Sequence, residues 1–161
     1  MLPDGLVYRS DFLTPDEEGI LLELLDATEL EPIVMRGVTA RRTALRFKDE
    51  FPDWLLPLRE RGAGLARVEP PDLAMALVQR YPPGAPIGWH RDYFAYGIVV
   101  GVSLGAEARM RFRRDGEQAE LLLERRSAYV LAGDARWKWE HHVPPVKELR
   151  YSITFRTSRQ S

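Results

Sequence analysis

The sequence predicts a mainly β protein of the α+β class, in which two N-terminal helices pack outside a β-sandwich or barrel. Two observations carry this prediction. Apolar residues in the N-terminal part recur with helical spacing, and from Leu73 onward the chain changes to short β-like runs separated by Gly, Pro and Asp. Such runs at intervals of about ten residues are typical of a sandwich or barrel, whose outer face the earlier helices would cover.

The two predicted helices have recognisable start signals and apolar stripes. Thr14 is a suitable N-cap, Pro15 fits the first turn, and acidic residues follow where the helix dipole favours them, so the first helix runs from about Pro15 to Ala27. Its expected buried stripe consists of Ile20, Leu21, Leu24 and Leu25. The second helix covers about Asp53 to Ala66, and its candidate buried residues are Trp54, Leu55, Leu58 and Leu65.

The predicted strands are short and have turn residues between them. They are Ala74–Tyr81, Gly97–Leu104, Arg109–Arg113, Glu120–Glu124, Ser127–Leu131, Trp137–Val143 and Arg150–Arg156. A chain of 161 residues has the size of one domain, so we expect a single domain over residues 1–161. Within it, residues 1–72 form an N-terminal helical part and residues 73–157 form the β core.

Composition excludes several kinds of site and partner. The chain has 45% hydrophobic and 29% charged residues and no cysteine, which excludes disulfides, Cys-based zinc or iron–sulfur sites and a thiolate nucleophile. The formal net charge is −1, so the protein as a whole has no strong field that draws it onto nucleic acid or anionic lipid. With neither a signal peptide nor a membrane-length apolar run, we expect a cytoplasmic protein without a membrane partner, monomeric by default.

Two histidines and an aspartate are the candidate metal ligands. His90 and Asp92 are two residues apart, so on an extended backbone their side chains point to one face. A further histidine, His141, lies on a predicted strand about fifty residues later. Two imidazoles and a carboxylate form the facial triad that leaves positions of Fe(II) open for a chelating cosubstrate and O2. A hydrolytic zinc site would use the same ligands, so the ligand set alone leaves both metals open.

The last predicted strand offers a receptor for a dicarboxylate. Strand alternation places four polar side chains on one of its faces, namely Arg150, Ser152, Thr154 and Arg156. Guanidinium groups that face into a barrel are costly unless an anion pairs with them, and they bind carboxylates in bidentate fashion. This suits a 2-oxo dicarboxylate whose other end chelates iron. The alternative is an edge strand whose polar face is solvated.

Five segments in order resemble the AlkB-type family of 2-oxoglutarate- and Fe(II)-dependent dioxygenases, over about residues 74–157. They are Gln79-Arg80-Tyr81-x-x-Gly84, Gly88-Trp89-His90-Arg91-Asp92, Gly101-Val102-Ser103-Leu104-Gly105, His141-x-Val143-Pro144 and Arg150-Tyr151-Ser152-Ile153-Thr154-Phe155-Arg156. The resemblance implies a double-stranded β-helix, or jelly roll. It also implies Fe(II) as the metal, 2-oxoglutarate as cosubstrate and O2 as oxidant.

The resemblance further assigns roles to individual residues. His90, Asp92 and His141 would bind iron, and the adjacent His142 would face the other side of its strand. Arg150 would pair with the distal carboxylate of 2-oxoglutarate. The remaining cosubstrate candidates are Tyr81, which would hydrogen-bond it, Arg156, which would lie near its iron-side end and fix Asp92, and Gln79 and Ser152, where other members have Asn.

The implied chemistry is oxidative removal of an alkyl group, mostly a methyl group on a base of DNA or RNA, with release of formaldehyde, succinate and CO2. The base must leave its stack to reach the pocket. Tyr93 and Phe94 follow the ligands and could stack on it, or could equally be core residues; some members have an acidic residue at the position of Phe94. The segment before the barrel would form a lid whose candidate phosphate contacts are Arg36, Arg41 and Arg42, although a solvated strand pair is an equal alternative.

Three other functions remain open at this point. The same oxygenase chemistry could act on a modified tRNA base, a protein or a small molecule. A silent jelly roll could bind nucleic acid through its arginines, and the strand with Arg109, Arg111 and Arg113 could be a phosphate track or a charge-protected edge. A zinc hydrolase lacks a general base beside its ligands, because strand alternation points Glu140 away from the face of His141.

Overall fold

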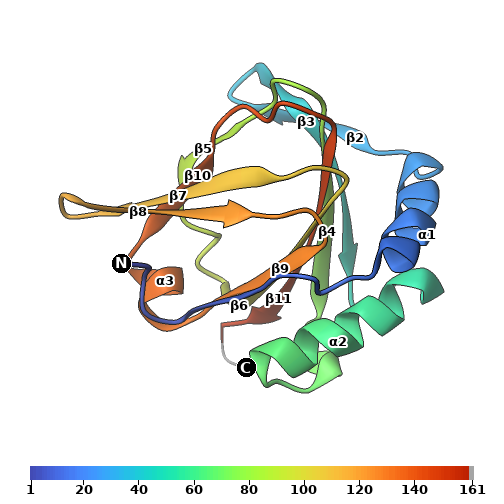
Figure 1. Ribbon diagram of the computed structural model, residues 1–161, viewed down its shortest axis with the longest axis horizontal. Coiled ribbons are helices and arrows are strands. Elements are labelled where there is room, and N and C mark those ends of the chain that lie inside the picture. Colours follow the sequence, from blue (N-terminus) through green and yellow to red (C-terminus); the bar gives the residue numbers. More distant parts are fainter. Residues whose placement is uncertain (160–161) are drawn as a thin grey trace.

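The computed structural model describes residues 1–159 and contains two antiparallel sheets that face each other (Figure 1). Across the larger sheet the strands are β1 (Leu6–Arg9), β9 (Ser127–Leu131), β6 (Tyr96–Leu104), β11 (Arg150–Ser158), β4 (Met75–Tyr81), β3 (Val38–Lys48) and β2 (Glu31–Met35). Across the smaller sheet they are β5 (Ile87–His90), β10 (Glu140–Val143), β7 (Ala108–Arg114) and β8 (Glu117–Leu123). The predicted mainly β jelly roll is confirmed.

Two helices cover the outer face of the larger sheet (Figure 1). They are α1 (Pro15–Asp26) and α2 (Leu56–Ala66), and a 3-10 turn, η1 (Asp53–Leu55), leads into the second. At the start of α1, Thr14 Oγ1 accepts a hydrogen bond from the Glu17 amide, and the Glu17 carboxylate accepts one from the Thr14 amide. This capping box satisfies two amides that would otherwise lack partners and fixes where the helix begins.

The main core lies between these helices and the larger sheet. Strand β11 contributes Tyr151, Ile153 and Phe155 to it, and the helical side contributes Leu21, Leu25, Leu55 and Leu58. Because side chains alternate along a strand, the remaining residues of β11 point the other way, into the space between the sheets. The prediction that Ile20 is buried is wrong, since its side chain is 62% exposed. The covered stripe of α1 is narrower than the sequence pattern suggests.

Two further segments differ from the predicted elements. The predicted strand Trp137–Val143 is wrong at its start, because the short helix α3 (Gly133–Trp137) ends there and β10 begins at Glu140. The buried Arg136 side chain in α3 donates hydrogen bonds to backbone carbonyls of Tyr93, Tyr96 and Gly97, and such tertiary contacts override local preference. A second 3-10 turn, η2 (Pro70–Asp72), precedes β4.

Strands β1, β2 and β3 come from residues 1–72, so this part of the chain supplies strands as well as helices. The hairpin of β2 and β3 extends the larger sheet beside β4, and its turn contains Arg36 and Gly37, both with positive φ. For this arginine-rich segment the sequence allowed either a phosphate-binding lid or a solvated strand pair, and the segment does form a pair of strands. The hairpin therefore adds a wall to one side of the space between the two sheets.

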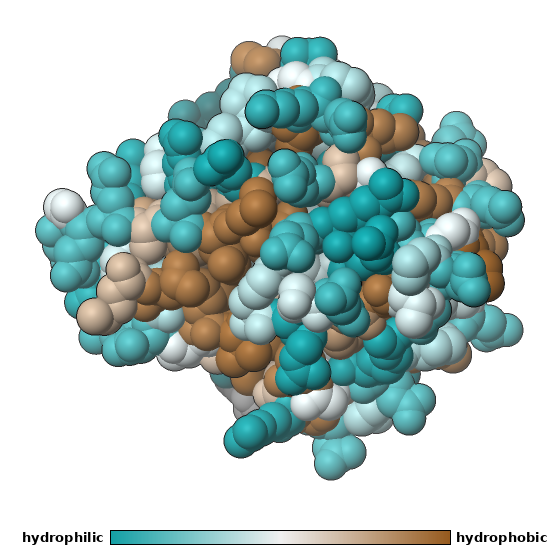
Figure 2. All heavy atoms as spheres, viewed as in Figure 1, coloured by the Kyte–Doolittle hydropathy of each residue, from teal (hydrophilic) through white to brown (hydrophobic). Residues whose placement is uncertain are grey.

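A second core cluster fills part of the space between the sheets. Its buried members include Met110, Phe112, Leu123 and Leu131. Half-buried residues of β1 and β8 pack against it, and Figure 2 shows apolar side chains gathered left of centre, in the area between these two strands. Within residues 1–159, no helix combines the length and the apolar character that crossing a membrane requires.

Candidate active site

The space between the sheets that the second core cluster leaves free forms a cavity of about 410 Å³. Strands β2, β3, β4, β6, β9 and β11 line it from the larger sheet, and β5, β7 and β10 line it from the smaller one. The loop after β5 also contributes. All the candidate metal ligands and all five candidate cosubstrate residues lie in this lining. The geometry thus brings the sequence-predicted residues together in one place.

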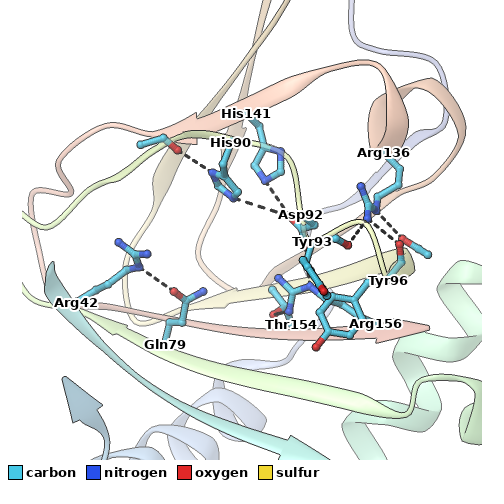
Figure 3. A network of polar contacts seen from close by, with 12 residues as sticks. Arg42, Gln79, His90, Asp92, Tyr93, Tyr96, Arg136, His141, Thr154 and Arg156 are labelled. Atoms are coloured by element: carbon cyan, nitrogen blue, oxygen red, sulfur yellow. Dashed lines mark hydrogen bonds and ion pairs between the residues drawn. The ribbon is translucent and has the colours of Figure 1, made fainter. Parts of the chain in front are cut away.

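The three candidate metal ligands converge at the wall that the smaller sheet provides. His90 on β5 and His141 on β10 are directly opposite each other in the strand pairing, and Asp92 follows β5. The Nε2 atoms of His90 and His141 lie 3.8 Å and 3.5 Å from Oδ1 of Asp92 (Figure 3). One ligand atom from each residue falls within 4.8 Å of the others, which is a suitable arrangement for a single ion.

Both histidines direct Nε2 toward Asp92. The Nδ1 atom of His90 lies 2.7 Å from the carbonyl oxygen of Gly88, and because a carbonyl only accepts, Nδ1 donates this hydrogen bond and Nε2 is the nitrogen on the side of the metal position. Burial lowers the pKa of His141 to about 3, so this imidazole is neutral at physiological pH. Neutral imidazole nitrogens are common ligands of Fe(II) and of Zn(II).

Asp92 supplies the negative charge. Burial alone would raise its pKa, but Arg156 together with His141 and His90 outweighs burial and lowers the pKa of Asp92 below its ordinary value. The Nε atom of Arg156 donates to Oδ2 at 2.6 Å, so the other oxygen, Oδ1, remains on the side of the histidines. Arg156 is held in turn by a 2.7 Å hydrogen bond to Thr154 Oγ1. The carboxylate is therefore ionised and oriented toward the metal position.

This donor set fits Fe(II). Two neutral imidazole nitrogens and one carboxylate oxygen occupy one face of an octahedral ion and leave positions for a chelating ligand and O2. The hydrolase alternative lacks support on the strand of His141, because Glu140 accepts a 3.1 Å hydrogen bond from Arg113 and pairs with it outside the cavity lining. His142 also faces away from the ligands, with its ring 4.1 Å from that of Trp89.

Arg150 lies at the other end of β11, deep in the cavity. Its side chain is 2% exposed, its Nε donates to Ser103 Oγ at 2.9 Å, and its guanidinium lies 5.1 Å from the centre of the Tyr81 ring. Within residues 1–159 no carboxylate pairs with it. A buried guanidinium without a counterion is costly, so this end of the cavity suits the carboxylate of a ligand. The edge-strand alternative is wrong, because β11 lies between β6 and β4.

The other candidate cosubstrate residues surround the same space. Tyr81, Gln79 and Ser152 are buried and line the cavity, and Gln79 and Ser152 are directly opposite in the pairing of β4 with β11. Gln79 Oε1 accepts a 3.0 Å hydrogen bond from Nε of Arg42 (Figure 3). The hairpin arginine therefore holds a side chain of the cavity wall in place.

The aromatic residues after Asp92 are at the surface. Tyr93 and Phe94 are 60% and 62% exposed, so the alternative that they fill the core is wrong. Tyr93 lines the cavity, and its ring lies 4.6 Å from that of Phe94 and 5.8 Å from that of Tyr96, the latter edge-on. The hydrogen bonds that Arg136 donates to three carbonyls hold this loop (Figure 3).

The candidate phosphate contacts are spread over different surfaces. Of the hairpin arginines predicted to contact phosphates, only Arg42 lines the cavity; Arg41 donates to the carbonyl of Pro83, and Arg36 lies in the exposed turn. The three arginines of β7 form ion pairs with carboxylates, Arg109 and Arg111 with Glu120 and Arg113 with Glu140. Strand β7 lies between β10 and β8, so it is not an exposed edge.

Sequence reasoning missed Tyr129, which also lines the cavity, as does Arg46 of the arginine-rich segment. Tyr129 on β9 packs over Gly101 on β6 so closely that a Cβ atom on this glycine would lie 2.2 Å from the tyrosine ring. Burial raises the pKa of Tyr129, so its phenol stays protonated. A glycine inside a predicted strand is the available signal, because it often marks such a close approach, although it does not say which side chain approaches.

Comparison with known proteins agrees with this geometry. The family model of the 2OG-Fe(II) oxygenase superfamily matches residues 32–156. A tRNA (carboxymethyluridine(34)-5-O)-methyltransferase, alkbh8 of Xenopus tropicalis, is 28% identical over 91% of this chain and 26% of its own length. The alpha-ketoglutarate-dependent dioxygenase AlkB of Salmonella typhimurium is 32% identical over 61% of this chain and 50% of its own. The chain thus spans half or less of these two relatives.

A solved structure has the same fold. The crystal structure of a Pseudomonas putida prolyl-4-hydroxylase matches with a TM-score of 0.72 at 18% identity, over 96% of this chain and 93% of that one. At this identity the likeness bears on the fold alone. The superfamily match covers most of the chain and includes every candidate metal and cosubstrate residue. The chain belongs to the 2OG-Fe(II) oxygenase superfamily and is an AlkB-type dioxygenase that depends on Fe(II), 2-oxoglutarate and O2.

Proposed function

We propose that the enzyme oxidises an alkyl group on a nitrogen of a nucleobase in DNA or RNA and so removes it. The observation that carries this proposal is that one cavity holds the metal ligands at its inner wall and the exposed ring of Tyr93 at its mouth. An extruded base can stack on such a ring, which is worth about 1–3 kcal/mol, while its alkyl group reaches the metal.

In this proposal, the residues that line the cavity bind the metal and the cosubstrate separately. His90, Asp92 and His141 hold Fe(II), and Arg150 pairs with the distal carboxylate of 2-oxoglutarate, with Tyr81, Gln79 and Ser152 around it. Arg156 keeps Asp92 ionised and in place. Bound Fe(II) and 2-oxoglutarate supply the oxidation of a C–H bond by O2. One oxygen atom enters succinate as CO2 leaves, and the other enters the alkyl carbon; a hydroxymethyl group on nitrogen then leaves as formaldehyde.

The names of the relatives favour a nucleic acid. One relative is named a tRNA methyltransferase and the other an AlkB dioxygenase. With a net charge of −1, the affinity of this chain for phosphates must come from local groups such as Arg36, Arg41 and Arg42. Oxidation of a modified tRNA base is the second candidate, because the tRNA-named relative aligns with 91% of this chain. A protein or small-molecule substrate remains the third.

The experiment is a substrate panel. The enzyme is loaded with Fe(II) without oxygen and then given O2, 2-oxoglutarate and methylated nucleosides within single-stranded DNA, RNA or tRNA. Mass spectrometry of the digested nucleosides detects loss or hydroxylation of the alkyl group, and succinate and formaldehyde are measured in parallel. His141→Ala is the control without activity. Succinate formation without change in any nucleic acid would contradict the proposal, and hydroxylation of a tRNA base without formaldehyde would favour the second candidate.

A further inference from the structure

The side chains that line the cavity have a marked excess of positive charge. Among the lining residues the only carboxylate is Asp92, and the arginines are Arg42, Arg46, Arg91, Arg150 and Arg156. Burial keeps His141 neutral. Fe(II) carries two positive charges and 2-oxoglutarate two negative ones, so their binding leaves this excess unchanged. The loop after Asp92 adds Tyr93, Phe94, Ala95 and Tyr96, none of which is acidic.

Three of these arginines already have partners in the cavity wall. Arg156 pairs with Asp92, Arg42 donates to Gln79 and to the carbonyl of Pro86, and Arg150 donates to Ser103. Arg46 and Arg91 differ, because the side chain of neither forms a hydrogen bond or an ion pair within residues 1–159. Their charges are therefore available to whatever enters the cavity.

Arg46 lies away from the cosubstrate end of the cavity. Along the paired strands, Arg150 is opposite Tyr81 at that end. Arg46 is opposite Leu77 on β4, and Leu77 is opposite Thr154 on β11. Thr154 is four residues further along β11 than Arg150, toward Arg156, which binds Asp92. Arg46 is exposed on β3 and also contributes to the lining, so it reaches from solvent into the half of the cavity that a substrate must enter.

This placement has a direct electrostatic consequence. A cationic group in the substrate half would lie near unpaired guanidinium groups, and the only carboxylate of the lining is already paired with Arg156. A neutral or anionic group would meet no such repulsion, and a carbonyl or carboxylate oxygen could accept a hydrogen bond from Arg46. Alkylated bases fall into both classes, since N3-methylcytosine is cationic at neutral pH and N3-methyluracil is neutral.

We propose that the cavity takes neutral or anionic alkylated bases and disfavours cationic ones, and that Arg46 is the residue that makes this selection. The inference rests on the proposed function, because it takes the substrate to be an alkylated base. It narrows that function to a substrate class by charge, and it predicts a preference between two bases of nearly the same shape.

The test compares two labelled single-stranded oligonucleotides that differ only in one base, N3-methyluracil in one and N3-methylcytosine in the other. Binding is measured by fluorescence anisotropy to enzyme loaded with 2-oxoglutarate and Mn(II), which prevents turnover. The ratio of the two dissociation constants cancels the phosphate contacts that the oligonucleotides share. For the wild type we expect about tenfold tighter binding of the N3-methyluracil strand at low salt, and a smaller ratio of the dissociation constants at high salt. For Arg46→Gln we expect this ratio to fall below about threefold, and for Arg46→Glu we expect tighter binding of the N3-methylcytosine strand. Arg9→Gln, which removes the same charge from exposed β1 at the opposite edge of the sheet, should keep the wild-type ratio.

Turnover with Fe(II) then separates the two proposals. Equal or tighter binding of the N3-methylcytosine strand, or a ratio that Arg46→Glu leaves unchanged, overturns the charge selection. If the binding ratio is as expected but neither base is demethylated, charge selection stands and demethylation of these bases is contradicted. If both bases are demethylated and N3-methylcytosine has the higher kcat/KM, the proposed function stands and the role of Arg46 is overturned.

Discussion

The Nε atom of Arg156 lies 2.6 Å from Oδ2 of Asp92, and this contact joins β11 of the larger sheet to the loop that follows β5 of the smaller one. The two sheets supply different parts of the site. The smaller sheet supplies the candidate imidazole ligands, and β11 and β4 supply the groups that could receive a dicarboxylate. Their relative position therefore depends in part on one charged hydrogen bond.

Replacing Arg156 with Gln should weaken metal binding by about tenfold to a hundredfold, the usual cost of losing a partner of a metal ligand. Without the guanidinium, burial raises the pKa of Asp92, and the carboxylate is free to turn. Anaerobic titration with Mn(II) measures the affinity without turnover. Arg113→Gln is the control, because it removes an exposed arginine whose partner, Glu140, is next to His141. Equal Mn(II) affinity of Arg156→Gln and the wild type would contradict the role of Arg156.

Replacing Arg150 with Gln should raise the KM for 2-oxoglutarate by about 30-fold to 150-fold, because a buried charged hydrogen bond to a carboxylate is worth roughly 2–3 kcal/mol. Mn(II) affinity without cosubstrate should stay within about twofold of the wild type, since Arg150 lies at the far end of β11 from Asp92. Arg109→Gln, an exposed arginine of β7, serves as the control. A KM that does not change, or a parallel loss of Mn(II) binding, would count against the assignment.

Local pattern was enough to predict one face of the site but not its surroundings. The period of two along residues 150–156 correctly separated Arg150 and Arg156 from the core-facing Tyr151, because alternation is a property of the strand itself. The position of the β2–β3 hairpin beside β4 depends on pairing between distant segments. The same holds for α3, which a buried Arg136 anchors to carbonyls about 40 residues earlier in the sequence. Neither leaves a periodic signal in the sequence.

Gly101→Ala should destabilise the protein by about 1–3 kcal/mol, because the added methyl group overlaps the ring of Tyr129 and forces it to move within a packed wall. Chemical denaturation of the metal-free protein measures this free energy of unfolding. Gly64→Ala is the matched control, since a Cβ atom on this glycine of α2 would meet nothing within 4 Å, and alanine is the better helix former. If the Gly101→Ala variant were as stable as the wild type, Tyr129 would be able to move away from the added methyl group without a loss of stability.

His141 and the adjacent His142 should contribute differently to the pH dependence of the free energy of unfolding. Burial lowers the pKa of His141 to about 3 from an ordinary value of 6.5, so between these values the unfolded chain binds a proton that the folded chain does not. The stability that His141 contributes is fully present above pH 6.5, the ordinary pKa, and is lost as the pH falls toward the folded-state pKa of about 3. We expect the metal-free protein to lose about 2 kcal/mol through His141 between pH 7 and pH 5.

Denaturation at the two pH values tests this dependence. His141→Gln should remove most of the difference, whereas His142→Gln, at a half-buried position beside Trp89, should remove much less of it. The same pair of variants tests the ligand assignment, because His141→Gln should abolish Mn(II) binding and His142→Gln should retain it. If the two variants behaved alike in both measurements, the opposite orientation of these neighbouring side chains on β10 would be wrong. If both variants changed the pH dependence alike but only His141→Gln lost Mn(II) binding, His141 would be less buried in solution, and its assignment as a metal ligand would stand.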